Sequence, residues 1–166
     1  SAWTDPADNA AVDHLRAVDM LAVNDGWAVG DAGAILHWNG AAWTRVAAPT
    51  TAALRGLQML TGNDGWAVGE AGVILHWNGA AWTGVAAPTN QSLNAISLAA
   101  AADGWAVGAG GVILHWDGSA WSLAVSPSGR DLFAVDMVTA TAGWAVGAAG
   151  TILHWDGSAW RVSDWP

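Results

Sequence analysis

The sequence repeats with a strict period of 39 residues, and this period constrains the fold more than any other feature. The segment Asp-Gly-Trp-Ala-Val-Gly occurs three times and returns once as Ala-Gly-Trp-Ala-Val-Gly. The repeated units begin at four equally spaced leucines: Leu15, Leu54, Leu93 and Leu132. Residues 15–53 and 54–92 are identical at 28 of 39 positions. Repeats of this length are typical of propellers, solenoids and arrays.

One repeat predicts four short strands. In the second repeat, we expect strands at 54–60, at 66–69, at 73–77 and from Trp82 onward. The first of these is ambiguous by hydrophobic period alone, but its brevity and the Gly-Asn-Asp-Gly that follows it favour a strand. Tryptophan and β-branched residues dominate the ordered stretches, and the glycines leave no helix of useful length.

The connection between the third and fourth strands carries the strongest local signal. Asn78 and Gly79 stand between two apolar strands, which predicts a two-residue type I′ turn. Such a turn would pair Trp77 with Ala80 and place Leu75, Trp77 and Trp82 on one face of the sheet. The other face would carry His76, Ile74 and Thr83, so both faces are largely apolar, as in a sheet that is packed on both sides.

Four short strands in each unit of about 40 residues are typical of a β-propeller blade. The predicted fold class is therefore all-β, a propeller of four-stranded antiparallel blades with four repeats in the chain. The expected division is a spare outer strand and linker at 1–14, followed by blades at 15–53, 54–92, 93–131 and 132–166.

The number of blades in the complete ring is left open by the sequence. The tryptophan that opens the fourth strand occurs five times: Trp3, Trp43, Trp82, Trp121 and Trp160. One copy of this strand is thus redundant, exchanged, or left from a lost blade. We favour slightly a closed four-bladed ring; the alternative is a homodimer that shares an eight-bladed ring. An open row is disfavoured because its end faces would expose large apolar patches.

Composition excludes several partners. The formal net charge is −9, and the basic residues are five scattered arginines, so nucleic acid and anionic membrane surfaces are disfavoured. No apolar run approaches the roughly 18 residues of a membrane span, which predicts a soluble protein without membrane insertion. The absence of cysteine leaves the compartment undetermined. Because the sequence starts at Ser1 rather than Met, targeting information is expected to be missing, and export from a bacterial cell stays open.

The stretch GWAVGEAGVILHWNGAAW resembles the WD40/YVTN/BNR-like propeller repeats of bacteria, including those of photosystem II assembly factors. The resemblance covers nearly the whole chain. It implies a propeller fold and specifies function poorly, because propellers host many unrelated activities. One motif departs from the BNR pattern: tryptophan follows Asp117 and Asp156 by four residues, whereas the Asp box has five, and Asn39 and Asn78 replace the aspartate elsewhere. A plain hairpin therefore fits better than an Asp-box loop.

The sequence predicts no enzyme, no metal site and no cofactor. Four of the five histidines occupy one repeat position: His37, His76, His115 and His154. Rotation about the ring would separate them, so we expect a histidine that is hydrogen-bonded within its own blade rather than a metal ligand. The BNR resemblance raises sialidase activity, but the chain has no tyrosine to serve as its nucleophile. Carboxylates that could act as a glycosidase pair lie in different blades.

With catalysis and metal binding disfavoured, the remaining class of function is ligand binding. The fourteen tryptophans are the most conspicuous candidates for contacts with a ligand. We expect Trp27 and its repeats Trp66, Trp105 and Trp144 to pack between blades. We expect the hairpin tryptophans to be partly exposed beside Asn, Asp or His, as a sugar-binding site needs. The candidate ligand-binding residues are Trp38, Asn39, Trp43, Trp77, Asn78, Trp82, Trp116, Asp117, Trp121, Trp155, Asp156 and Trp160.

Three hypotheses for the function follow from this pattern. The first is a non-catalytic, multivalent lectin-like module that binds glycans through its hairpins, with avidity from equivalent sites. The alternative is a scaffold for protein interaction or assembly, with a protein partner held on the ring's top face or over its channel. A further alternative is an amplified or engineered repeat array without a specific ligand.

Overall fold

The computed structural model describes residues 14–163, and these residues form four antiparallel sheets of four strands each. Blade 1 contains β1 (Leu15–Ala22), β2 (Asp25–Gly30), β3 (Ile35–Trp38) and β4 (Trp43–Arg45). Blade 2 contains β5 (Leu54–Thr61), β6 (Asp64–Gly69), β7 (Ile74–Trp77) and β8 (Trp82–Val85). Blade 3 contains β9 (Leu93–Ala100), β10 (Asp103–Gly108), β11 (Ile113–Trp116) and β12 (Trp121–Leu123). Blade 4 contains β13 (Leu132–Thr139), β14 (Ala142–Gly147), β15 (Ile152–Trp155) and β16 (Trp160–Val162).

Each blade is a meander in which neighbours in sequence pair in the sheet. The all-β class and the four strands per repeat are thereby confirmed, and the first strand of each sheet begins at the leucine that opens each repeat. A short 3-10 turn joins the second and third strands of every blade: η1 (Asp31–Gly33), η2 (Glu70–Gly72), η3 (Ala109–Gly111) and η4 (Ala148–Gly150). The spare strand predicted at 1–14 lies, except for His14, outside the described residues.

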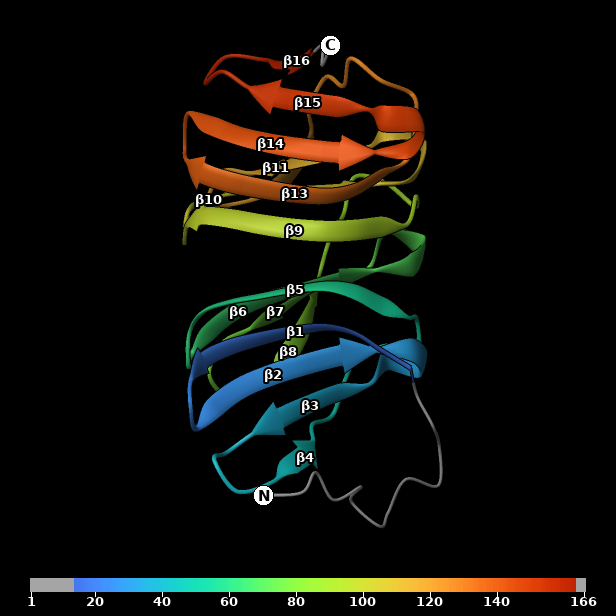
Figure 1. Cartoon of the computed structure of the whole chain (residues 1–166). Helices are drawn as coiled ribbons and strands as arrows, with labels where there is room; N and C mark the ends of the chain where they lie inside the picture. The colour runs from blue at the N-terminus through green and yellow to red at the C-terminus, as the bar shows by residue number, and fades with distance from the viewer. Residues whose placement is uncertain (1–13, 164–166) are drawn as a thin grey trace.

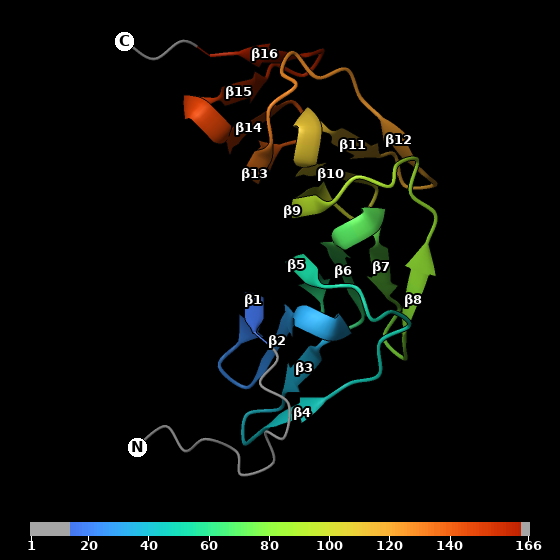
Figure 2. The ribbon, with the colours of Figure 1, turned by 90° about the vertical axis from the view of Figure 1, so that its right-hand side faces the viewer.

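The four blades form an open arc. The first strands of the blades, β1, β5, β9 and β13, follow one another along the concave side, whereas the fourth strands lie on the convex side (Figures 1 and 2). Blades 1 and 4 lie at opposite ends of this arc (Figure 2). The favoured expectation of a ring closed by four blades is therefore wrong for the single chain, because blades 1 and 4 do not meet.

The hairpin between the third and fourth strands differs from the predicted two-residue turn. Trp77 pairs with Trp82, not with Ala80, so the connection has four residues, 78–81. The Asn78 side chain explains the longer loop: its Oδ1 accepts hydrogen bonds from the backbone N–H groups of Ala80 and Ala81, both at 3.0 Å. Gly79 has a φ of 87°, which favours glycine at this position. The predicted face is nevertheless preserved, because Trp77 and Trp82 are now direct neighbours across the ladder.

The core consists of three layers, one between each pair of consecutive blades. The layer between blades 1 and 2 packs Trp27, Val29 and Ile35 against residues of blade 2 such as Leu54 and Trp82. Equivalent buried clusters lie between blades 2 and 3 and between blades 3 and 4. Both faces of an inner sheet are thus buried, which explains the apolar residues on both faces. Among the described residues, no helix is long and apolar enough to cross a membrane.

Candidate functional site

We call the tryptophans in the second strand of each blade, Trp27, Trp66, Trp105 and Trp144, the opening tryptophans. The first three pack between blades. The Trp27 ring lies 4.8 Å from the Trp77 ring of the next blade and 5.6 Å from that of Trp82, the latter edge-on. The same two contacts recur between blades 2 and 3 and between blades 3 and 4. Trp27, Trp66 and Trp105 are 2–3% exposed, as expected for residues that hold blades together. Trp144, which no following blade covers among residues 14–163, is 44% exposed.

The hairpin tryptophans of the candidate glycan site are more engaged in the fold than the sequence indicated. Trp82, Trp121 and Trp160 are only 4–5% exposed, and Trp43 is the one described member of this class that is half-buried. The tryptophans that end the third strand of each blade are half-buried. Their indole N–H donates to the turn between the first two strands, as in the 3.1 Å bond from Trp38 to the Val23 carbonyl. The equivalent bonds are made by Trp77, Trp116 and Trp155. The indole N–H groups of these rings are therefore already engaged within their own blades.

The hairpin Asn and Asp residues also serve their own loops. Asp117 Oδ1 accepts hydrogen bonds from the Ser119 hydroxyl and from the N–H groups of Ser119 and Ala120, at 2.7 to 2.9 Å. The Ser119 hydroxyl contributes most to lowering the pKa of Asp117 from 3.8 to about 2, followed by the Ala120 and Ser119 amides. In blade 4, the Ser158 hydroxyl, with Arg161 next, holds the pKa of Asp156 well below its usual range. The Oδ1 atoms are thus already engaged within the hairpins.

The repeated histidines pair with carboxylates inside three blades. His37 Nε2 lies 2.8 Å from Asp25 Oδ1, and equivalent pairs join His76 to Asp64 and His115 to Asp103. Each of these rings also lies 4.4 Å from the opening tryptophan of its own blade. In blade 4, Ala142 stands where the aspartate would be. The His–Asp pairs join the second and third strands of one blade. Within residues 14–163 no three potential metal ligands come together.

A mainly polar group of side chains that was not predicted from the sequence lies where the concave strands begin. We call it the inner rim and define it as Arg16, Asp31, Arg55, Glu70, Asn94 and Phe133. Arg16 binds Asp31 through two N–H groups, with Nε at 2.5 Å from Oδ1 and Nη2 at 3.1 Å from Oδ2. Arg55 Nη2 binds Glu70 at 2.7 Å, and its Nη1 crosses to blade 3 to bind Asn94 at 2.9 Å.

Position in the repeat could have revealed the inner rim. Arg16 and Arg55 are 39 residues apart, and so are Asp31 and Glu70, whereas composition alone shows only scattered charges. The hydrogen bond between Arg16 and Asp31 raises the pKa of the arginine and lowers the pKa of the carboxyl group. The side chains of Arg16 and Arg55 are 43% and 33% exposed beside the concave surface, although the Nε atom of Arg55 is buried without a hydrogen-bond partner among the described residues.

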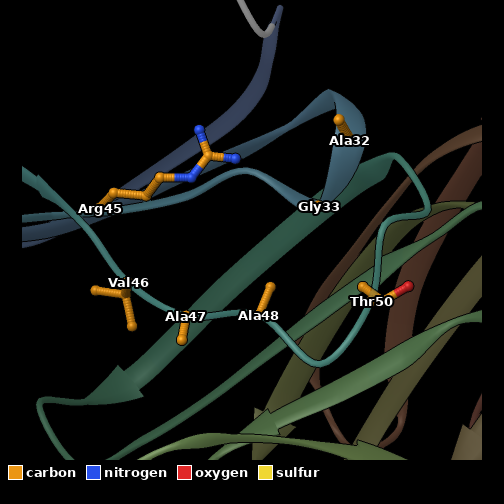
Figure 3. Close-up of a pocket in the computed structure, with 7 residues that line it drawn as sticks. All are labelled: Ala32, Gly33, Arg45, Val46, Ala47, Ala48 and Thr50. Atoms are coloured by element: carbon orange, nitrogen blue, oxygen red, sulfur yellow. The ribbon is translucent and has the colours of Figure 1, made fainter. Parts of the chain in front are cut away.

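Two shallow pockets lie at the same end of the blades as the 3-10 turns. The first, of about 450 Å³, lies in blade 1 (Figure 3). There Ala32 and Gly33 of η1 face Arg45 of β4 and Thr50 of the following segment. The second has a similar volume and occupies the corresponding place in blade 4, where Ala149 and Gly150 contribute. Each lining combines one arginine, Arg45 in the first pocket and Arg130 in the second, with smaller side chains, and neither lining pairs a nucleophile with a base.

Solved structures resemble this arrangement over nearly the whole chain. The structure described as YCF48 bound to D1 peptide superposes with a TM-score of 0.74 at 18% identity, covering 95% of this chain and 55% of that one. The four sheets of this chain are therefore propeller blades. YCF48 from Cyanidioschyzon merolae gives a TM-score of 0.69 at 19% identity, covering 97% of this chain and 59% of that one. The RRP9 WD40 repeats give 0.70 at 11% identity, covering 90% and 52%.

These likenesses show the fold, and the resemblance to YCF48 and WD40 propellers is thereby confirmed. No protein-family model matches the chain, and no curated protein matches it in sequence. The chain spans between half and three-fifths of the length of the structures it resembles. The four blades thus correspond to about half of a longer propeller chain.

Proposed function

We propose that the chain is a non-catalytic recognition propeller that binds a segment of another protein at the inner rim. The observation that carries this proposal is the pair of partly exposed arginine side chains on adjacent blades, with the exposed Phe133 at the same repeat position in blade 4. Guanidinium N–H groups donate to carboxylates and peptide carbonyls, and an aromatic face accepts an apolar side chain. An extended peptide segment with an acidic and an apolar residue fits this combination.

The similar structures support a protein partner more than a glycan. One of them is YCF48 bound to a D1 peptide, and it superposes on 95% of this chain. The glycan hypothesis relies on hairpin tryptophans, and three of the eight proposed rings are at most 5% exposed. We therefore place the scaffold hypothesis first and keep lectin activity as the competing outcome.

A second copy of the chain belongs to the same proposal. The described residues of one chain form four blades, and the chain spans roughly half the length of the propellers it resembles. Two chains would supply eight, which is within the usual range of closed rings. We infer that the homodimer is the form that presents a complete inner rim.

Parallel peptide and glycan arrays test the proposed recognition. The purified chain is labelled and applied to an array of short peptides, both acidic and neutral, and to a glycan array. We expect peptide binding that falls at least about tenfold in the Arg16→Gln, Arg55→Gln double variant, because each lost charge-assisted hydrogen bond contributes about 1.5–3 kcal/mol. Arg161→Gln is the matched control, because Arg161 lies on the outer strand β16 and should leave binding unchanged.

Two results would contradict the scaffold hypothesis. Glycan binding without peptide binding would favour the lectin hypothesis, and the Trp43→Ala variant would then show whether the half-buried hairpin ring takes part. Binding to neither array by the folded chain would favour a repeat array without a specific ligand.

A further inference from the structure

The two ends of the arc expose the two halves of one interface. Inside the chain, each opening tryptophan packs on two hairpin tryptophans of the next blade, as Trp27 packs on Trp77 and Trp82. At the blade 4 end, Trp144 has the opening position, and the described part of the chain contains no blade after it. At the blade 1 end, Trp38 and Trp43 have the receiving positions and no preceding described blade.

Hydrogen bonds between blades show the same pattern. Asp19 Oδ2 accepts from the Met59 backbone N–H at 2.7 Å, which joins the first strands of blades 1 and 2. The bonds at the same repeat position in the next two joints run from Leu98 N–H to Gln58 and from Met137 N–H to Ser97. The fourth acceptor of this series is Asp136, in the last blade. The fourth donor is the N–H of Met20, in the first.

The end faces are apolar as well as complementary. Leu15 is 53% exposed at the blade 1 end, whereas its equivalents Leu54 and Leu93 are fully buried. At the blade 4 end, Val146 is 43% exposed, whereas the equivalent Val107 is fully buried. Large exposed apolar surfaces on soluble proteins mark interaction sites. Three blade-to-blade joints already show how such faces pack.

We propose that a second copy of this chain covers both end faces by docking head to tail, so that two chains close one eight-bladed ring. Blade 4 of each copy would meet blade 1 of the other, and the two joints would be identical by two-fold symmetry. The ring of Trp144 would pack on Trp38 and Trp43 of the second copy, and Asp136 would accept the Met20 N–H. The inference specifies the joint of the proposed shared ring and does not depend on which ligand the ring binds.

The observations favour a second copy over an unrelated partner. One chain carries both halves of the joint, Trp144 in blade 4 and Trp38 with Trp43 in blade 1, at the positions that meet in the internal joints. The two end faces are therefore complementary to each other. Two arcs also account for roughly the full length of the propellers that the chain resembles. At the inner rim, Phe133 would face Arg16 of the second copy, because Asn94 and Arg55 occupy these positions where blades 2 and 3 meet. A guanidinium beside an aromatic ring is favourable.

The solution mass of the intact chain tests this joint without any ligand. Light scattering after size-exclusion chromatography should give twice the 16.9 kDa of one chain. The Trp144→Glu variant should give the mass of one chain, with at least about 100-fold weaker association, since central tryptophans dominate interface energies. Val125→Glu is the control, because Val125 is an exposed apolar residue on the connection after β12; it should remain dimeric.

A tandem fusion keeps the test decisive if Trp144→Glu does not fold. Two copies joined by a flexible linker should form one monomeric ring with the hydrodynamic radius of the unfused dimer. A folded intact chain that stays at the mass of one copy would overturn the proposal. Dimers that persist in a folded Trp144→Glu variant would also overturn the proposal. Open-ended assemblies of more than two chains would overturn it as well. Peptide binding is not part of these measurements, so failure of the joint and failure of the proposed recognition are distinguishable.

Discussion

At the scale of single residues, one repeat position performs one structural task with different chemistry. The hairpin position is Asn39 and Asn78 in blades 1 and 2, and Asp117 and Asp156 in blades 3 and 4. Both residue types accept the same two backbone N–H groups through Oδ1. Only the aspartates titrate, and both are followed two residues later by a serine that adds a hydroxyl donor. The loop geometry is therefore common to all blades, whereas its response to pH is not.

The carboxyl group of Asp117 should make stability depend on pH in acid. Its folded-state pKa is lowered to about 2 from 3.8, so it stabilises the fold above the unfolded value and loses this contribution as pH falls through about 2. We expect Asp117→Asn to reduce the midpoint of thermal unfolding at pH 5 and to match the parent chain near pH 2.

Unfolding by circular dichroism from pH 2 to pH 5 checks this prediction. Ser119→Ala is the informative companion, because it removes the hydroxyl that contributes most to the lowered pKa and keeps the carboxylate. It should show a smaller pH dependence than the parent chain. Identical pH profiles for the parent chain and Asp117→Asn would show that this hydrogen-bonded carboxylate does not contribute.

At the scale of elements, the 3-10 turns place one residue in the left-handed region of the backbone. That residue is alanine in three blades, with φ of 54° for Ala32 and Ala71 and 52° for Ala149. In blade 3 it is Gly110, with φ of 63°. A Cβ at Gly110 would meet no atom within 4 Å, so only backbone conformation opposes a side chain there. The turn tolerates alanine but does not favour it.

Replacing Gly110 by alanine should therefore cost about 1 kcal/mol of unfolding free energy, since the left-handed conformation opposes an L side chain. Gly84→Ala is the matched control. Gly84 also has open space around its Cβ position, but it lies in β8 without a positive φ. This control should be neutral or stabilising by about 0.5 kcal/mol, because alanine lowers the entropy of the unfolded chain. Urea unfolding measures both, and equal effects would contradict the conformational explanation.

At the scale of the whole molecule, stability should be graded along the arc when the chain is alone. Inner blades are covered on both faces, but blades 1 and 4 each lack one neighbour among the described residues. Repeat proteins are stabilised by the interfaces between neighbouring repeats, so the outer blades of an open arc should open more readily. A closed ring would remove this difference.

Hydrogen exchange measured by mass spectrometry checks the expected gradient. In the monomeric Trp144→Glu variant, amides of β1 and β13 should exchange at least about tenfold faster than amides of β5 and β9, because the outer blades have one joint fewer. In the Val125→Glu control, which keeps both end faces, the four blades should exchange at similar rates. Uniform protection in a confirmed monomer would contradict the open arc as the isolated form.

The sequence predicted the repeat unit well because the unit is encoded locally. The number and order of the strands and the packing role of Trp27 follow from short patterns that every repeat contains, whereas the second strand begins two residues earlier than predicted, at Asp64 in blade 2. The hairpin register was predicted wrongly, since Asn78 Oδ1 binds two amides and stabilises a four-residue loop that competes with the two-residue turn. The inner rim was missed because its arginines are brought together only when blades stack.

By itself, the sequence determined four blades, their strand order, and the tryptophans between them. Only the tertiary structure decided that four blades stop short of a ring. Because the repeats are nearly identical, no local pattern in them specifies how many blades complete a ring. The angle between blades is the combined result of many side chains packing across each joint. The same packing explains why Trp144 is exposed while Trp27, Trp66 and Trp105 are buried. A residue's surroundings here depend on whether another blade follows.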